Sequence, residues 1–185
     1  MSRLWVLLFV TGCSSAAPTA SPQSVSDTPA CEAVTEWDET AARFEADLVN
    51  LLNIERSRGG RCGDQTFSSQ PPLTMHPSLR CAARLHAQSM RDDNYVDYKH
   101  PAPPDGTELG LQQWLEAAEY EPAVYAQNMG AGWPSAREAV DAWLASEAHC
   151  WKFMTAEMLH IGVGVAITPT DESGEIPEDS YDNYW

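Results

Sequence analysis

The sequence predicts a mixed α+β fold, in which helices come first along the chain and strands alternate with helices after them. Apolar side chains recur at helical spacing in segments 44–52 and 79–90, so each segment presents one apolar helix face. Segment 161–167 is rich in β-branched residues between turn residues, which is typical of a strand. With 185 residues, of which 43% are hydrophobic, the chain is long enough for one packed domain with tails.

The first two helices have clear start and stop signals. The first begins at Asp38 and ends at Gly59-Gly60, because Asp caps helix N-termini and glycine ends helices. The second begins at Pro77, since proline suits the first helical turn, and ends near Asp93-Asn94. Prolines between Pro101 and Gly106 then force a loop.

Two further helices and the strands follow. A third helix is expected over residues 108–118, and a fourth begins at the capping box that runs from Ser135 to Glu138. Segment 124–129 is short and has the composition of a strand edge. The glycines within segment 161–167 indicate close backbone approach or a bulge.

The charge of the chain excludes one class of partner. It has 11 Lys and Arg against 27 Asp and Glu, a net charge of −16, so we expect no nucleic-acid partner. Part of that charge lies in the C-terminal segment 168–185, where residues 171–182 include six acidic and no basic side chains. That segment is expected to be solvated, and Tyr184 and Trp185 are expected to form a last edge strand.

The N-terminus indicates export. Arg3 precedes an apolar run, Leu4 to Val10, that is too short to span a bilayer, so residues 1–12 form a predicted signal peptide. The run leads to Cys13 and resembles the lipobox of bacterial lipoproteins, in which the cysteine is lipidated. Residues 13–30 are rich in Ser, Ala, Pro and Thr and are expected to be a flexible tether. The prediction is an extracytoplasmic bacterial lipoprotein on the outer membrane or cell surface.

The chain has five cysteines, and four remain to form disulfides if Cys13 carries lipid. Outside the cytoplasm an even number favours two disulfides, and the absence of a Cys-x-x-Cys pair argues against thiolate metal binding. The residues alone permit three connectivities among the four: Cys31, Cys62, Cys81 and Cys150.

Several segments, taken in order, resemble the bacterial branch of the CAP superfamily, whose domain is also called the SCP domain. Each piece is weak alone, but the ordered set extends from residue 45 to residue 167. The matching segments are Leu52-Asn53-Ile54-Glu55-Arg56, residues 72–90, Tyr98-Lys99-His100, Ala126-Gln127-Asn128-Met129-Gly130, Ala139 to His149, and Ile161 to Ala166. The resemblance implies a domain over residues 31–167, built as an α-β-α sandwich with a central antiparallel sheet flanked by helices.

The resemblance also implies a cleft that contains His100, Gln127, Ser146 and His149. Two neutral imidazoles, His100 and His149, would bind a divalent ion such as zinc, weakly because structural and catalytic zinc sites usually have three or more protein ligands. Gln127 stands where the family has a carboxylate, and an amide cannot be a general base. Glu147 is a poor substitute, because its side chain is expected to point elsewhere. By the same resemblance the disulfides pair Cys62 with Cys150 and Cys31 with Cys81.

Three functions are compatible with these residues. The first is a lipid-anchored binding or interaction module that uses the His100/His149 cleft for an ion, a lipid or another envelope component, and it is favoured by the missing carboxylate. The second is a hydrolase or peptidase, with metal-bound water or with Ser146 and His149 as candidate catalytic residues. The third is a structural envelope lipoprotein. Other residues have structural interpretations: Asn128 binds backbone, and His86 and Trp143 belong to the core.

Overall fold

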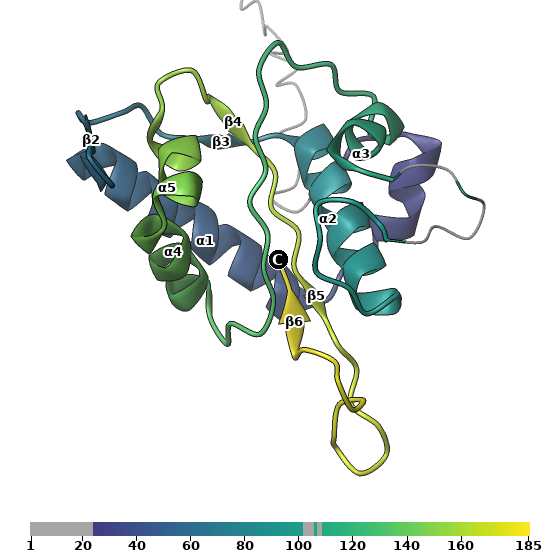
Figure 1. Ribbon diagram of the computed structural model, residues 1–185. Helices are drawn as coiled ribbons and strands as arrows, with labels where there is room; N and C mark the ends of the chain where they lie inside the picture. The colour runs from purple at the N-terminus through teal and green to yellow at the C-terminus, as the bar shows by residue number, and fades with distance from the viewer. Residues whose placement is uncertain (1–23, 102–105, 107–108) are drawn as a thin grey trace, which may run out of the picture.

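The structure is a computed structural model that describes residues 24–101, 106 and 109–185. The predicted signal peptide, the predicted lipidated Cys13 and most of the tether lie outside these residues. The helices are η1 (Pro29–Val34), α1 (Glu39–Arg58), α2 (Pro77–Asp92), α3 (Leu111–Ala117), α4 (Ala136–Ala145) and α5 (Glu147–Met154). Helices α1, α4 and α5 lie on one side of a layer of extended segments, and α2 and α3 lie on the other (Figure 1).

The helices begin where their capping residues predict. Asp38 accepts hydrogen bonds from the first-turn amides of α1, and Ser135 accepts one from the Glu138 amide at the start of α4. The fourth helix does not continue to His149. Ser146 has extended backbone angles (φ −100°, ψ 120°) and separates α4 from α5. One helix is predicted after Ser135, whereas the fold has two in this region.

The strands form three separate two-stranded pairs in place of one broad sheet. The first two strands, β1 (Gly60–Cys62) and β2 (Gln65–Phe67), form an antiparallel hairpin. The next pair, β3 (Thr74–Met75) and β4 (His160–Ile161), is parallel, whereas the expected sheet was antiparallel. The last pair, β5 (Ala166–Ile167) and β6 (Asn183–Tyr184), is antiparallel.

Two glycines explain why the predicted strand over 161–167 is interrupted. A Cβ on Gly162 would lie 2.0 Å from the carbonyl group of Leu79, and one on Gly164 would lie 2.4 Å from the carbonyl carbon of Ala83. The backbone here rests directly on α2, so only glycine fits and the segment packs on a helix between its two short strands.

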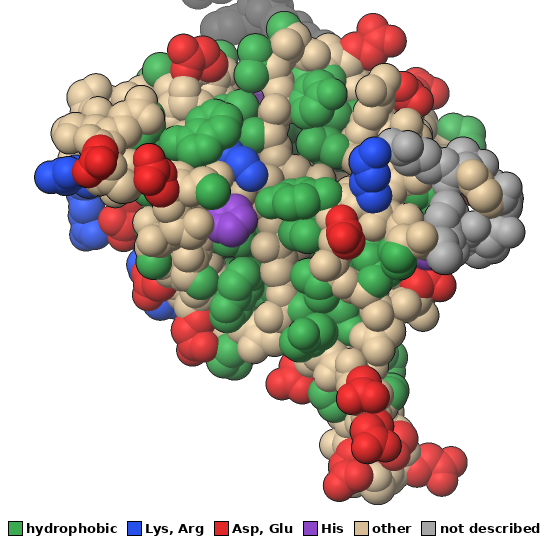
Figure 2. Space-filling model, viewed as in Figure 1, with side chains coloured by type: hydrophobic (Ala, Val, Ile, Leu, Met, Phe, Trp, Pro, Cys, Tyr) green, Lys and Arg blue, Asp and Glu red, His purple; other side chains and the backbone are tan. Residues whose placement is uncertain are grey.

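The last residues of the chain belong to the core. Tyr184 and Trp185 are 0% and 5% exposed, and the Trp185 ring stacks on Phe44 of α1. Backbone hydrogen bonds in both directions join Trp185 to Gly130. The acidic residues before them form the loop that projects at the bottom of the molecule (Figures 1 and 2).

A buried ion pair joins the two helical layers. Glu45 of α1 accepts two hydrogen bonds from Arg84 of α2, at 2.9 and 2.8 Å, and neither side chain is exposed. Arg80 lies 3.6 Å from the same carboxylate, and Arg84 also donates to the Val34 carbonyl of η1. The pair therefore connects three helices, since Arg84 binds both Glu45 of α1 and the Val34 carbonyl of η1.

Two disulfides add covalent ties. Cys31–Cys81 joins η1 to α2, and Cys62–Cys150 joins β1 to α5. These are the pairs that the family resemblance implied. Disulfides of this kind stabilise small exported domains by about 2–5 kcal/mol each.

Within the described part of the chain, no helix has the length and apolar character that a membrane span requires.

We expect Glu45→Gln to lower the free energy of unfolding by about 3–5 kcal/mol, because the buried arginines then lose their counter-charge. Urea unfolding of the purified domain measures this change. Asp47→Asn is the matched control, since it makes the same chemical change at an exposed position of the same helix. A loss below about 1 kcal/mol in Glu45→Gln would contradict this role.

Candidate functional site

An extended segment, residues 120–129, crosses the front of the molecule between α3 and α4 (Figure 1). We call it the strap. Among the described residues, those from 121 to 126 make no hydrogen bond to the rest of the chain, and Val124 and Tyr125 are 59% and 51% exposed. The strap is therefore held mainly at its two ends.

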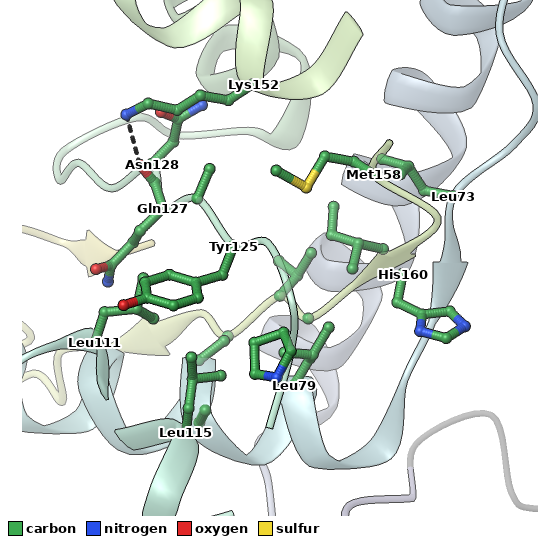
Figure 3. Close-up of a pocket in the computed structure, with 18 of the residues that line it drawn as sticks. Leu73, Leu79, Leu111, Leu115, Tyr125, Gln127, Asn128, Lys152, Met158 and His160 are labelled. Atoms are coloured by element: carbon green, nitrogen blue, oxygen red, sulfur yellow. Dashed lines mark hydrogen bonds between the residues drawn. The ribbon is translucent and has the colours of Figure 1, made fainter. Parts of the chain in front are cut away.

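A cavity of about 370 Å³ lies under the strap. Its walls come from α2, α3, the strap and the segment that includes β4, and most of the lining side chains are apolar. Leu79 and Leu115 lie on one side of it and Met158 on the other (Figure 3). Hydrophobic side chains also gather on the outer face around the strap (Figure 2). The volume falls within the range of about 300–1,000 Å³ that is usual for small-molecule sites.

A histidine and an amide form one polar wall of the cavity. The Gln127 amide nitrogen lies 2.6 Å from Nδ1 of His86, and Nε2 of His86 lies 3.1 Å from the carbonyl oxygen of Asp97. A carbonyl only accepts, so Nε2 carries the proton and Nδ1 accepts a hydrogen bond from the Gln127 amide. This assignment leaves His86 neutral, with both ring nitrogens bonded.

Burial favours the same neutral state. It lowers the pKa of His86 from 6.5 to about 4, and this effect outweighs the opposing contribution of Asp97. A charged His86 would also lose the hydrogen bond from Gln127, because a protonated Nδ1 cannot accept one.

This contact gives a reason for the amide at position 127. A carboxylate has no proton to donate to a neutral Nδ1, so a glutamate here would bond well only to a protonated His86. Gln127 suits a neutral histidine. Its other amide atom, Oε1, is buried without a hydrogen-bond partner in the described residues.

Lys152 of α5 supplies a positive charge at one end of the cavity. Its ammonium group donates to the Gln127 carbonyl at 2.8 Å (Figure 3) and lies 5.5 Å from the centre of the Tyr98 ring. No carboxylate forms an ion pair with it in the described part of the chain. Burial lowers the pKa of Lys152, which is the expected effect on a partly enclosed cation.

Of the predicted cleft residues, Gln127 lines the cavity, whereas His100, Ser146 and His149 are not among its lining residues. His100 is 9% exposed, its Nε2 lies 3.0 Å from the Asp93 carboxylate, and its ring packs 4.8 Å from that of Tyr95. No hydrogen bond or ring contact between His100 and His149 occurs in the described residues. His100 therefore fastens the loop after α2 to the end of that helix.

The residues near the second predicted histidine belong to α5 and its cap. His149 is half-buried, and burial together with the charge of Lys152 lowers its pKa. The Asn128 amide donates to the His149 carbonyl at 3.1 Å, which is the structural role expected of Asn128. Ser146 makes no side-chain hydrogen bond to His149 among the described residues, since it lies at the break between the two helices.

Within the described residues, the two predicted metal ligands are not grouped with further donor side chains. No group of three or more His, Cys, Asp or Glu side chains in the described segments is arranged to hold a metal. Nε2 of His100 is already bonded to Asp93, and Gln127 turns toward His86. Zinc binding by His100 and His149 stays a prediction from the resemblance.

Sequence reasoning missed the cavity and two of its polar residues. His86 lies on the apolar face of α2, where the pattern predicts a core residue, and Lys152 lies in a helix that the pattern did not predict. A signal was present in the strap, where Pro122 to Tyr125 places apolar residues in a segment with no helical spacing.

Helices on both faces of short strands, two disulfides and a ligand-sized cavity define a disulfide-tied α+β sandwich with a binding site under one crossing segment. The chain matches the model of the CAP family, the cysteine-rich secretory protein family, over residues 49–185. It therefore belongs to that family, and the resemblance in its motifs is confirmed.

Two relatives of the chain are bacterial proteins, as the resemblance to the bacterial branch predicts. YkwD of Bacillus subtilis, described as uncharacterized, is 30% identical over 142 residues, which cover 77% of this chain and 48% of YkwD. YlbC of the same organism, described as an uncharacterized membrane protein, is 25% identical over 78% of this chain and 36% of its own length. The chain thus spans about half or less of these relatives.

A solved structure shares the fold. The crystal structure of an extracellular protein containing a SCP domain, from Bacillus anthracis, aligns with a TM-score of 0.54 and 21% identity. The alignment covers 77% of this chain and 38% of that one.

We expect His86 to be neutral at pH 7. We also expect the free energy of unfolding to decrease as the pH falls, because the unfolded chain binds a proton at this position more readily than the folded chain does. The unfolded chain binds a proton at this position near pH 6.5 and the folded chain near pH 4. Stability is therefore lost as the pH falls between these values, by about 3 kcal/mol in full. Imidazole ¹⁵N NMR across this range measures the protonation of His86 directly.

Gln127→Glu should raise the pKa of His86 above that of the parent, because a carboxylate at hydrogen-bond distance stabilises the imidazolium. Gln65→Glu, the same change on the exposed strand β2, should leave the His86 titration unaltered. An unchanged His86 titration in Gln127→Glu would show that the contact is not made in solution.

Proposed function

We propose that this protein is an extracytoplasmic binding module, anchored to the membrane by lipid on Cys13, that binds the apolar chain of an anionic amphiphile in the cavity under the strap. The observation that carries the proposal is the combination of an apolar cavity with Lys152 at its edge. The comparisons support an extracytoplasmic location, since the relative of known structure is described as extracellular. Two disulfides are typical of exported proteins.

The lining of the cavity selects the apolar part of the ligand. Leucine, methionine and aromatic side chains from four segments face a space that water would occupy at a cost, because they offer it few hydrogen bonds. A single acyl or alkyl chain buries its methylene groups there, at about 0.8 kcal/mol per buried group.

Lys152 selects the charge of the head group. The chain as a whole is strongly acidic, so a half-buried lysine that pairs with no carboxylate of the described segments attracts an anion locally. A carboxylate or phosphate at the end of an acyl chain would pair with the ammonium group while the chain lies in the cavity under the strap. Neutral His86 and Gln127 add no charge that would repel it.

The geometry favours binding over hydrolysis. A serine nucleophile needs a base within hydrogen-bond reach, and Ser146 has none among the described residues. Gln127 cannot act as a base. The histidines of the predicted cleft would then have positioning roles, His100 in the loop after α2 and His149 beside Lys152.

We expect the purified domain, residues 24–185, to bind dodecanoate and 1-dodecanol, as measured by displacement of a fluorescent fatty acid. Leu115→Trp fills the cavity and should abolish the binding of both ligands. Leu111→Trp is a second filling variant at a less buried position, and Val96→Trp adds the same bulk at an exposed site outside the cavity. Binding that survives both filling variants would place the ligand elsewhere.

Lys152→Met should weaken the binding of dodecanoate about tenfold, or ~1.4 kcal/mol, and leave the binding of 1-dodecanol unchanged. The methionine keeps most of the apolar stem and removes the charge, together with the hydrogen bond to the Gln127 carbonyl. Equal weakening of both ligands would show that Lys152 acts through packing, not through charge.

A further inference from the structure

Two histidines and a tyrosine hold the strap at the end of the cavity that is opposite Lys152. The Tyr120 ring lies 4.7 Å from the His76 ring, and its hydroxyl group is 3.2 Å from Nδ1 of His160. The His76 and His160 rings are 5.2 Å apart. His160 and Tyr120 both line the cavity, and Figure 3 shows His160 and Lys152 at opposite ends of it.

The Tyr120 side chain holds the start of the strap, through this cluster and through packing against the apolar cluster around Leu115. The Tyr120 backbone is bonded to the end of α3, through its amide and the Leu115 carbonyl at 3.0 Å. The next six residues make no hydrogen bond to the rest of the described chain, so the position of the strap here depends on the Tyr120 side chain.

His76 can keep its place only as a neutral ring. Its Nδ1 accepts a hydrogen bond from the Ser78 amide at 3.3 Å and thereby caps the N-terminus of α2. A proton on Nδ1 would end that bond, would set a cation against the positive end of the helix, and would face a second histidine. Burial and His160 both lower the pKa of His76, in agreement with these contacts.

The backbone on either side of His76 cannot follow the ring. The His76 amide donates to the Ile161 carbonyl at 2.9 Å, within the pairing of β3 with β4. A protonated ring must therefore turn away by rotation of its side chain. Tyr120 then loses its ring contact with His76 and keeps only its packing against the apolar cluster around Leu115.

Acidic side chains lie near the cluster in the sequence, but none that the structure describes pairs with its histidines. Glu119 and Glu121 flank Tyr120, and Glu157 precedes β4, yet none of them forms an ion pair with His76 or His160 in the described part of the chain. Arg80, one turn into α2, lies against Glu45. The weak attraction of an imidazolium for the Tyr120 ring is the one contact that would favour the charged state.

We propose that His76, Tyr120 and His160 form a pH-sensitive latch that holds the strap over the cavity when His76 is neutral and releases it when His76 is protonated. The proposal rests on the proposed function for the meaning of release, since the cavity is the site that opens. An exported protein experiences the pH of its surroundings, so such a latch would couple ligand exchange to external acidity.

The test follows the release of N-phenyl-1-naphthylamine, an apolar fluorescent probe that stays uncharged between about pH 5.5 and pH 7.5. This range keeps His86 neutral, because its pKa is about 4. We expect release from the parent to be faster at the lower pH by on the order of tenfold, which is an ordinary size for coupling between sites. His76→Asn caps α2 without titrating, so its release rate should not depend on pH.

His160→Gln is the matched variant. Glutamine still accepts a hydrogen bond from Tyr120 but carries no charge, so the acceleration should persist with its midpoint at higher pH. A pH-independent parent, or acceleration that survives in His76→Asn, would overturn the latch.

A measurement without ligand separates the latch from the proposed function. NMR signals of the Tyr120 ring, shifted by the neighbouring His76 ring, should move toward those of an exposed tyrosine as the pH falls in the parent but not in His76→Asn. If the probe fails to bind while these signals move, the proposed function fails and the latch stands. If the probe binds and the signals stay fixed, the latch alone fails.

Discussion

The buried pair of Glu45 and Arg84 is the interaction on which the arrangement of the site depends. Its carboxylate lies on α1 and its guanidinium on α2, so it sets the separation of the two helical layers. The Val165 amide also points at the Glu45 carboxylate, at 3.4 Å, so the segment between β4 and β5 is held in the same place. That segment and α2 form two walls of the cavity. Two buried charges with full hydrogen bonding tolerate few other geometries, since a shift would leave one of them unpaired.

The site built on this frame is neutral where the family pattern implies charge. Gln127 donates to His86, and the His86 proton is fixed on the opposite nitrogen by the Asp97 carbonyl. A carboxylate in place of the amide would demand a protonated, buried histidine, which burial disfavours. The amide and the low pKa of His86 are therefore two aspects of one requirement, a polar wall without charge. Such a wall admits an apolar chain, and the charged side chains that line the cavity are then Lys152 and Glu157.

Sequence patterns predicted the elements whose signals are local and missed those that depend on distant contacts. Asp38, Pro77 and Ser135 mark helix starts through hydrogen bonds and angles within one turn, and each helix begins there. The division of the last helices at Ser146 has no such signal. The strand predicted around Gly162 is broken because its backbone rests on α2, a contact with residues about 80 positions earlier. His86 was assigned to the core from its apolar face, and only the folded chain shows that its ring reaches Gln127.

The two ends of the strap are held by interactions of different strength, and this difference gives the cavity an opening side. At the far end, Trp143 donates to the Met129 carbonyl at 3.1 Å, Gly130 pairs with Trp185, and Lys152 and Asn128 bind strap and helix backbone together. All of these contacts keep their form across the pH range in which histidine titrates. The near end depends on Tyr120, whose ring contacts His76, whose hydroxyl group lies beside His160, and which packs on the cluster around Leu115. Any loosening of the strap must therefore begin at Tyr120, at the apolar end of the cavity. The other end, beside Lys152, stays in place, and a charged head group would lie there.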